Sequence, residues 1–535
     1  MTKISRRRFL EESLFATFAA GAAAASLTAV PQPLLAAEQK VGANDRLGVL
    51  LFGAGGRGGD HIKFFAADKR TEILFVCDPD SVVAERRCAE IEQIQGTRPK
   101  AVADMRTVLD DKSIDVMTCA ATNHWHALSG IWAMQAGKHC FIEKPISHNI
   151  HEGKALVAAA KKYKRIVQTG SQMRSVPVNV ELVKFVHNGG IGEVNFARGL
   201  CYKRRAAIGP RGEYPVPPSV DYDLWSGPAQ LRPVTRPRFH YDWHWQRYYG
   251  NGDLGNQGPH QTDIARWLLG VERFPQSVMT YGGRLGYDIE KNDPNYVDAG
   301  DVSNTDVTIF DYGDKCIVFE TRGLETGNLT IPAGTGQRPG TLVGVIAYGK
   351  NGYAIQGPAT RGQTYTYSAA YDLDGNVIAE FRVGSGNNLV ETQATGATTT
   401  FIGADATHYG NFVEAVLADK PEMLTADVRV GALSAAMSHL GHISYYLGEK
   451  NKVSPADIQK VLESVKSLDD NAATLARTVE HLEANGVDLK RTPLALGPML
   501  KIDVEKEVFI DNAEANAMLT RDYRVPYVVP APENV

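Results

Sequence analysis

Between residues 46 and 170, short apolar runs alternate with segments in which apolar residues recur at helical spacing. The runs predict strands at 46–52, 72–77, 101–102 and 114–121, and a further strand that ends at Lys144. The segments between them predict helices at 61–68, 81–94, 105–109 and 127–136. Regular alternation of strand and helix predicts an α/β fold, a doubly wound parallel sheet with helices on both faces.

The pattern changes at about residue 171, where β-rich sequence with frequent glycine begins. Strands are expected at 193–202, 306–311, 315–321 and 342–348, and helices at 408–417, at 428–447 and from 453 onward. We therefore expect three folded parts: the doubly wound domain at 45–170, an α+β domain at 171–450, and a helical and extended docking segment at 451–535. That last segment would dock on its own subunit or on a neighbouring one.

The first 37 residues form a separate unit that we exclude from the fold. Ser5-Arg6-Arg7-Arg8-Phe9-Leu10 is typical of a twin-arginine export signal, and an alanine-rich segment at 13–30 and small residues at 36–37 follow it. The alternative is a membrane-anchoring helix, but alanine and glycine make the segment weakly hydrophobic for stable spanning. We expect a signal peptide at 1–37 and a periplasmic or other extracytoplasmic protein that is exported already folded.

Composition excludes some classes of partner. Lys and Arg number 57 against 61 Asp and Glu, a net charge of -4, so no overall field favours nucleic acid or an anionic membrane. The six cysteines show no zinc-binding spacing. Because the protein would fold in a reducing compartment before export, we expect free thiols rather than structural disulfides.

A glycine-rich turn follows the first strand. Its sequence is Gly53-Ala54-Gly55-Gly56-Arg57-Gly58, which fits the dinucleotide-binding pattern GxGxxG in its required place between a strand and a helix. Gly53 would permit the tight turn, and Gly55 would let the backbone approach a pyrophosphate at the helix N-terminus. Asp78 ends the second strand, 25 residues after Gly53, and would bind the adenosine ribose hydroxyls. Its charge favours NAD over NADP, although Arg57 keeps NADP possible.

The run Cys140-Phe141-Ile142-Glu143-Lys144-Pro145 has the pattern of a buried strand that carries charged groups to the edge of a sheet. Partial desolvation at such an edge would lower the pKa of Lys144 toward a range useful for proton transfer. A solvated surface pair is the alternative interpretation of Glu143 and Lys144. In the loop after the strand at 114–121, Asn123 would lie where the nicotinamide half of a dinucleotide reaches. His124 and His126 are candidate substrate contacts, and His126 also a candidate cofactor contact, although a histidine packed in a loop is the more common case for each.

A second block of polar residues lies at 250–263. Pro259 suits the first turn of a helix that buries Ile264 and Leu268. His260 would share that first turn, where the positive end of the helix dipole favours a neutral imidazole. Asp263 would either orient His260 or simply stabilise the helix N-terminus.

These motifs together resemble the Gfo/Idh/MocA oxidoreductases, a family that includes glucose-fructose oxidoreductase and inositol dehydrogenase. The segments that carry the resemblance are GAGGRG at 53–58, CAATNHWHA at 119–127, AGKHCFIEKP at 136–145, the region 147–155, 168–170 with Arg174, 250–269 and 408–447. The resemblance implies a Rossmann domain that binds NAD, a catalytic Lys144, a substrate contact at Arg174, and a second domain whose open, mainly antiparallel sheet covers the nicotinamide. The family has Asp four residues before the histidine, whereas this chain has Asn256 before His260. An amide cannot relay a proton, so Asn256 is expected to position a substrate hydroxyl instead.

The segment 239–249 is dense in aromatic residues. If it forms a strand, Trp243 and Trp245 share one face, while His240, Asp242 and His244 share the other. Trp243 could then stack on a sugar and His244 could contact its hydroxyls. The alternative is a metal site of two histidines and one carboxylate, but the family's chemistry needs no metal and we expect none.

The resemblance implies an exported NAD(P)-dependent oxidoreductase that acts on a sugar, polyol or glycoside and forms a homo-oligomer. Lys144 and His260 would handle the hydroxyl proton during hydride transfer, while Glu143 orients the lysine and the nicotinamide ribose. Outside the cytoplasm free nicotinamide is scarce, so a bound cofactor would be regenerated in place by a second carbonyl substrate. The alternatives are a redox-neutral NAD-dependent glycoside hydrolase, in which the hydride returns to the same substrate, and a sugar-binding protein with structural NAD.

Overall fold

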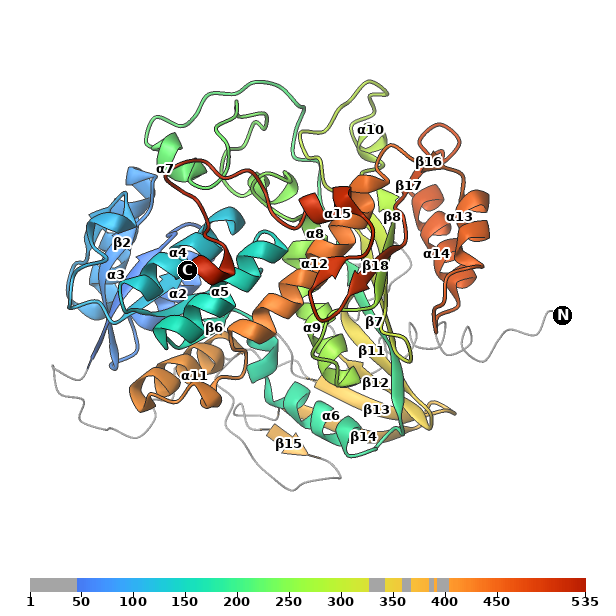
Figure 1. The fold of residues 1–535 in the computed structure, drawn as a ribbon, viewed down its shortest axis with the longest axis horizontal. Helices are drawn as coiled ribbons and strands as arrows, with labels where there is room; N and C mark the ends of the chain where they lie inside the picture. The colour runs from blue at the N-terminus through green and yellow to red at the C-terminus, as the bar shows by residue number, and fades with distance from the viewer. Residues whose placement is uncertain (1–45, 327–341, 358–366, 384–388, 392–403) are drawn as a thin grey trace.

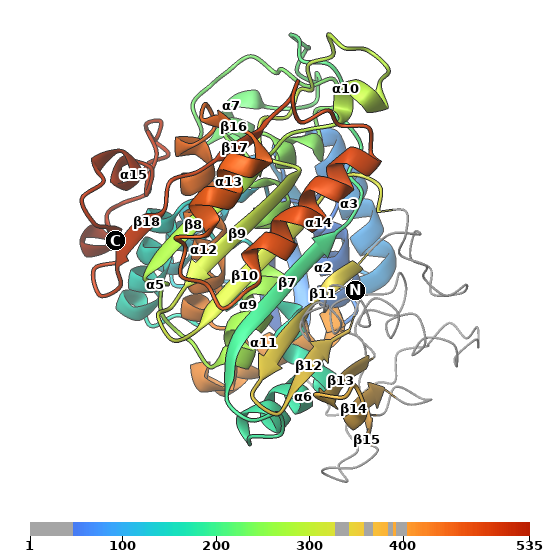
Figure 2. The same cartoon turned by 90° about the vertical axis from the view of Figure 1, so that its right-hand side faces the viewer.

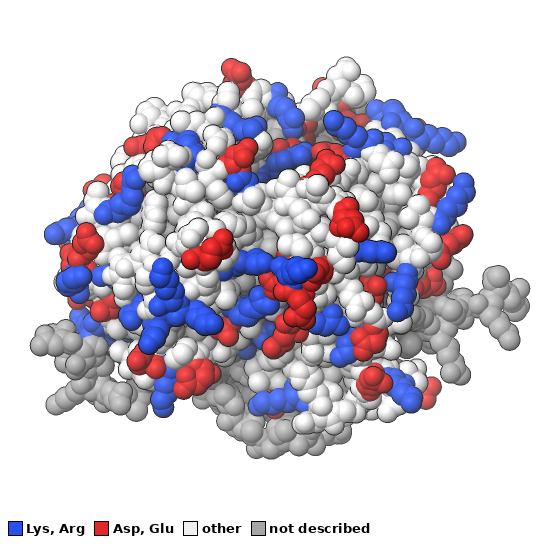
Figure 3. Space-filling view, in the orientation of Figure 1, with Lys and Arg blue, Asp and Glu red and all other residues white. Residues whose placement is uncertain are grey.

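The computed structural model describes residues 46–326, 342–357, 367–383, 389–391 and 404–535. The expected export signal lies outside these residues. Two sheets of different kinds stand beside each other, with a layer of helices between them (Figure 1). The face shown in Figure 3 carries Lys and Arg interspersed with Asp and Glu. No described helix has both the length and the apolar character needed to cross a bilayer.

The first sheet is six-stranded and parallel, with strand order β3-β2-β1-β4-β5-β6, which confirms the predicted doubly wound domain. Its strands are β1 Leu47–Phe52, β2 Thr71–Cys77, β3 Lys100–Val102, β4 Val116–Cys119, β5 His139–Ile142 and β6 Val167–Thr169. Its connecting helices are α2 Gly58–Phe65, α3 Ser81–Gln95, α4 His126–Gln135 and α5 Ile150–Tyr163. The prediction of a helix at 105–109 is wrong. Met105–Thr107 forms only one 3-10 turn, and the Asp104 side chain caps it by accepting a hydrogen bond from the Arg106 amide.

The second sheet is 13-stranded and mixed, and it confirms the expected change of architecture. Its principal strands are β7 Val194–Tyr202, β8 Ser277–Gly283, β9 Thr305–Asp311, β10 Cys316–Arg322, β11 Leu342–Gly349, β12 Gly352–Gln356, β13 Tyr367–Asp372, β14 Val377–Val383 and β15 Leu389–Glu391. Short strands β16 Lys452–Val453, β17 Leu494–Leu496, β18 Leu500–Asp503 and β19 Val508–Phe509 extend it. All neighbours pair antiparallel except β7 and β10, which run parallel. The sheet is therefore open and mainly antiparallel.

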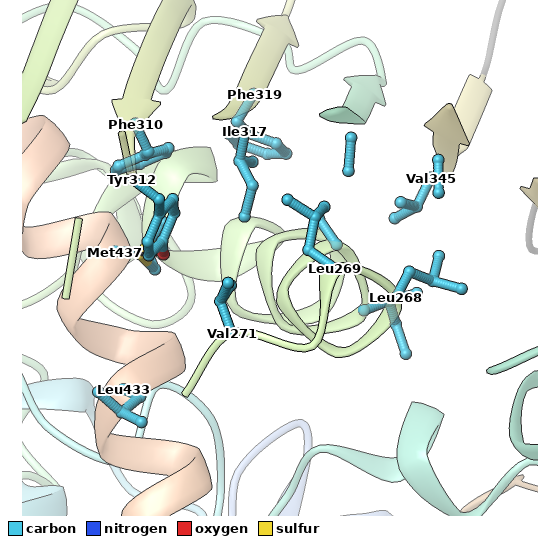
Figure 4. Close-up of a cluster of buried hydrophobic side chains, with 14 of the residues drawn as sticks. Leu268, Leu269, Val271, Phe310, Tyr312, Ile317, Phe319, Val345, Leu433 and Met437 are labelled. Carbon is cyan, nitrogen blue, oxygen red and sulfur yellow. Dashed lines mark hydrogen bonds between the residues drawn. The ribbon is translucent and has the colours of Figure 1, made fainter. Parts of the chain in front are cut away.

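Helices α9 Gly258–Leu269 and α12 Val428–Leu447 fill the space between the two sheets. Leu268 and Leu269 of α9 point at Ile317, Phe319 and Val345 of the second sheet (Figure 4). Helix α12 contacts both α9 and α5, so it joins the two domains. Because the buried face of α9 is fixed against the sheet, the first turn of this helix is held rigidly toward the first domain.

The opposite face of the second sheet is covered by α13 Pro455–Leu462 and α14 Asn471–Ala484 (Figure 2). A buried ionic group joins this cover to the sheet: Arg198 contacts both Glu320 and Asp469, and Tyr202 donates to Glu320 at 2.7 Å. Buried charges persist only where they are paired and hydrogen-bonded. Helices α13 and α14 near the end of the chain thus add a further layer to the second sheet.

Two segments from the C-terminal half return to the first domain. Helix α11 Ala404–Ala418 packs Tyr409 and Phe412 against Phe141 of β5. The tail after α15 Ala513–Ala517 crosses to α4, where the Tyr527 ring lies 5.5 Å from that of Trp125 (Figure 1). The extended segment therefore docks on its own chain in this structure.

All six cysteines are buried and unpaired, including Cys77, Cys119 and Cys140 in the parallel strands where the sequence placed them. Burial raises the pKa of the Cys119 thiol to about 11, which keeps it protonated.

Candidate active site

The glycine turn between β1 and α2 has the geometry that its sequence predicts. Gly53 has φ +84°, and a Cβ on it would lie 2.4 Å from the Ala121 nitrogen. A Cβ on Gly58 would lie 2.3 Å from the Gly53 carbonyl oxygen. Above Gly55 and Gly56, by contrast, no heavy atom lies within 4 Å of the Cβ position. Two glycines are therefore needed for packing, and the other two leave open backbone that a phosphate can approach.

Asp78 lies beside this turn, directly after β2. Its Oδ2 accepts a hydrogen bond from the Ala54 amide at 2.8 Å, and its Oδ1 accepts from the Asp80 amide at 2.9 Å. The side chain stays partly exposed. The glycine turn, the N-terminus of α2 and a carboxylate at the end of β2 form the set of groups that binds the adenosine half of a dinucleotide, so these residues fit NAD.

Arg57 and Glu143 bind each other and side chains from other elements. Arg57 Nε donates to Glu143 Oε1 at 2.8 Å, and its terminal nitrogens bind both oxygens of Asp405 at 2.7 and 2.9 Å. His61 lies 3.3 Å from the same Glu143 oxygen. Burial alone would raise the pKa of Glu143, but Arg57 and His61 hold it well below its usual value. These ion pairs join the turn, β5 and α11, and the cofactor roles of Arg57 and Glu143 stay predictions.

Lys144 follows β5 and reaches across to the second domain. Its Nζ donates to the main-chain oxygen of Asn256 at 2.6 Å and to Asn256 Oδ1 at 2.9 Å. Burial lowers the pKa of Lys144 to about 8; Glu143 opposes the shift, and the positive charges of Arg57 and Arg205 add to it. A lysine with this pKa exchanges protons readily near neutral pH.

His260 lies in the first turn of α9, as predicted, and is 5% exposed. Burial and the nearby Lys144 lower its pKa to about 3, so the imidazole is neutral at physiological pH. Its Nδ1 is buried and has no hydrogen-bond partner among the described residues. Buried polar atoms are usually paired, so the unpaired ring nitrogen makes this turn a candidate position for binding a ligand.

Arg174 and Asp263 bind each other. Arg174 donates to the two Asp263 oxygens at 2.8 and 3.0 Å and lies over the Trp267 ring. Ser434 donates to Asp263 at 2.7 Å. The predicted orienting role of Asp263 is therefore wrong, because its oxygens bind Arg174 and Ser434 and His260 Nδ1 has no partner among the described residues. The substrate role of Arg174 stays a prediction.

The loop after β4 divides its polar residues between two roles. Asn123 begins a 3-10 turn at the end of β4, is buried, and its amide makes no hydrogen bond to another described residue. It remains a candidate for the nicotinamide half. The ring nitrogens of His126 lie 2.7 Å from the Pro145 oxygen and 3.0 Å from the Ala121 oxygen. These contacts place the His126 ring between two loops, and its cofactor role stays a prediction; His124 is packed in the same way between carbonyl oxygens.

The aromatic segment is not a strand. Asp242–Trp245 forms a 3-10 turn after Tyr241, whose φ of +65° ends any extended conformation. His240 turns away to Asp80, at 2.9 Å, whereas His244 stacks on Trp243 with 3.6 Å between ring centroids. No group of three or more His, Cys, Asp or Glu suitable for a metal occurs among the residues described. Trp243 and His244 are half-buried, and they remain candidates for substrate contact.

One ion pair near the lysine escaped the sequence analysis. Arg205 follows β7 and binds Asp253 through three contacts of 2.6 to 3.1 Å, and it lies over the Trp245 ring. Asp253 lies in the polar block at 250–263, but the sequence around Arg205 does not indicate that Asp253 is its partner. The positive charge of Arg205 contributes to the lowered pKa of Lys144.

A Rossmann sheet with a glycine turn is thus joined to a second domain whose Asn256 binds the lysine after β5, an arrangement that fits a two-domain NAD-binding protein. Two family models agree: residues 47–171 match "Oxidoreductase family, NAD-binding Rossmann fold" and residues 161–288 match "Oxidoreductase family, C-terminal alpha/beta domain". Residues 47–288 thus match the two domains of the Gfo/Idh/MocA oxidoreductases.

Individual relatives resemble parts of the chain. Levoglucosan dehydrogenase of Pseudarthrobacter phenanthrenivorans is 29% identical over 181 residues, which are 34% of this chain and 39% of the relative. Glycosyl hydrolase family 109 protein 1 of Shewanella sp. strain ANA-3 is 26% identical over 215 residues, 36% of this chain and 45% of the relative. The chain therefore spans less than half the length of these relatives. A solved structure of levoglucosan dehydrogenase with NADH and levoglucosan shares the fold, with a TM-score of 0.51 and 19% identity over 74% of this chain and 96% of that one.

Proposed function

We propose that the protein is an NAD-dependent oxidoreductase that oxidises a secondary alcohol of a sugar, polyol or glycoside. The observation that carries this proposal is the position of Lys144 Nζ, between the end of β5 and Asn256 and close to the neutral His260. When bound, NAD supplies the hydride acceptor. The similarity to a levoglucosan dehydrogenase supports a carbohydrate as the substrate.

The protein's own residues manage the proton. As the C–H bond loses its hydride, the hydroxyl loses its proton to the neutral amine of Lys144, and the substrate becomes a carbonyl compound. His260 has a pKa of about 3, so at neutral pH its imidazole is uncharged: one ring nitrogen keeps its proton, and the other can accept a hydrogen bond from the substrate. Its position at the buried start of α9 excludes water from one side of the reacting carbon.

The second candidate is a redox-neutral glycoside hydrolase, which the similarity to a family 109 glycosyl hydrolase favours. Both candidates begin with the same oxidation, so product analysis separates them. We expect incubation with a panel of sugars, polyols and aryl glycosides to yield a carbonyl product and NADH, or a carbonyl product and a reduced second sugar. Release of the aglycone without net oxidation would establish the hydrolase instead, and binding without either product would leave a sugar-binding protein.

We further propose that the protein is exported by the twin-arginine route with its cofactor bound, on the basis of the sequence at 5–10. A folded passenger can carry NAD into a compartment that holds little of it, and the cofactor would then be regenerated by a second carbonyl substrate. Fusing residues 1–37 to a folded reporter tests export: periplasmic reporter is expected, and its loss when Arg6 and Arg7 are both replaced by lysine.

Asp78 is expected to set the preference for NAD. In D78S the ribose loses hydrogen bonds to a charged acceptor, each worth about 1.5–3 kcal/mol, so affinity for NAD should fall by about 10- to 100-fold and the preference over NADP should narrow. Fluorescence titration with both cofactors measures this. The matched control is D115S, which loses a comparable bond to the Gly48 amide, 2.8 Å long, at the opposite end of β1. Equal effects of the two changes would contradict a direct role of Asp78.

A further inference from the structure

Asn256 holds the amine of Lys144 from the second domain. It ends the short helix α8 Gly252–Asn256, and its main-chain oxygen and Oδ1 both accept from Lys144 Nζ, at 2.6 and 2.9 Å. The two residues are 112 positions apart in the sequence. Because both acceptors belong to one residue, they fix the direction of the amine as well as its position.

The acceptors on the amine are neutral. Glu143 is adjacent in sequence, but its carboxylate accepts from Arg57 and His61, and no carboxylate of the described residues lies within ion-pair distance of Lys144 Nζ. The charged and titratable groups that act on this amine come from several elements: Glu143, Arg57, Arg205, Lys203, His126, His244 and His260. Apart from Glu143, these groups are cationic or neutral. They therefore do not stabilise the positive charge of the Lys144 ammonium form.

The side-chain amide of Asn256 also carries a donor, the Nδ2 group, which does not take part in the contact with Lys144. Since Oδ1 faces Lys144, the Nδ2 group lies on the other side of the amide, and it makes no hydrogen bond to another described residue. The residue is half-buried rather than fully enclosed. A carboxylate in this place would have acceptors only.

We propose that Asn256 is a positioning residue: it holds the Lys144 amine with two neutral acceptors and presents Nδ2 to an oxygen of the substrate. One amide thereby aligns the proton acceptor with the hydroxyl that it deprotonates. An amide, unlike a carboxylate, does this without stabilising the ammonium form. The inference rests on the proposed oxidation at this site.

The decisive variant is N256D, which adds a negative charge at hydrogen-bond distance from Nζ. An opposite charge this close shifts a pKa by about 1–3 units toward the charged form, here upward from about 8. Lys144 must be neutral to accept the proton, so alcohol oxidation at pH 7 should fall at least about 10-fold and recover as the pH rises. In N256A the upward shift should be absent, while kcat/KM falls about 10-fold because Oδ1 and Nδ2 are both lost.

The matched control is Q257E, which places a carboxylate on the next residue, whose side chain makes no hydrogen bond to Lys144. We expect its pH profile to stay close to that of the wild type. If N256D leaves the profile unchanged, or if Q257E shifts it equally, direct positioning by Asn256 is refuted. A merely structural role for Asn256 would lower the rate at every pH without moving the profile.

A measurement without turnover separates this inference from the proposed function. Trace labelling of amines at a series of pH values, read by mass spectrometry on the peptide that contains Lys144, gives the titration curve of that amine in the intact protein. A higher pKa in N256D than in the wild type and Q257E supports the contact even if no substrate is oxidised, in which case the proposed function alone fails. Equal curves in all three proteins overturn the inference whatever the activity.

Discussion

Replacement of Lys144 by methionine is expected to lower kcat for alcohol oxidation by about 10²- to 10⁴-fold, the usual contribution of a positioned general base. Methionine keeps much of the side-chain volume but cannot accept a proton. Affinity for NAD should change little, because the glycine turn and Asp78 bind the other half of the cofactor. Steady-state rates and cofactor titration measure the two effects separately.

K144R is the matched control for charge. Arginine keeps the positive charge but stays protonated at any usable pH, so it cannot act as the base. We therefore expect K144R to be as inactive as K144M. In the wild type, oxidation should increase as the pH rises through about 8, where the Lys144 amine loses its proton, and then level off. Activity in K144R close to that of the wild type would show that the lysine acts through its charge alone.

Replacement of Arg174 by methionine is expected to destabilise the protein by about 3–5 kcal/mol, because it leaves the Asp263 carboxylate buried without its ion-pair partner. Denaturant unfolding at neutral pH measures this loss. R98M is the control, since Arg98 pairs with Glu85 and Glu92 on the surface and its loss should have no measurable effect. Folded R174M should keep the wild-type KM. An increase in KM without any loss of stability would instead support the substrate role predicted for Arg174.

The same ion pair predicts a pH dependence. Burial alone would raise the pKa of Asp263, but Arg174, Arg266 and Ser434 lower it below 3.8. A carboxyl group whose folded pKa is depressed contributes stability above its unfolded pKa, and this contribution disappears as the pH falls through the folded pKa. The difference in stability between the wild type and R174M should therefore be largest at neutral pH and should shrink in acid.

Short sequence patterns predicted the site residues whose positions depend only on their neighbours in the sequence. Gly53 needs its positive φ for a turn within a few residues, and Lys144 stands where a short buried strand must end. His260 shares the first turn of α9 with Pro259, and helical spacing placed both. These positions follow from strand, turn and helix rules, so the sequence was sufficient for them.

Long-range contacts decided the positions that the sequence misjudged. Arg174 and Asp263 are 89 residues apart, and Arg57 and Asp405 are 348 apart, so no local pattern announces either pair. The segment at 239–249 alternates like a strand. In the structure, however, the His240 ring contacts the Asp80 carboxylate of the other domain, and Tyr241 has a positive φ. Such contacts depend on how the two domains meet, which periodicity does not encode.

The proposed function requires that this chain holds NAD and reduces it with a carbohydrate. The absorbance spectrum of the purified protein, with analysis of the released cofactor, tests this directly before and after addition of sugars and polyols. We expect NAD in the protein, or NAD binding when it is added, and the absorbance of NADH after at least one of these substrates. If no dinucleotide is released and none binds, the assignment of the glycine turn and Asp78 is wrong, and the oxidoreductase function fails with it.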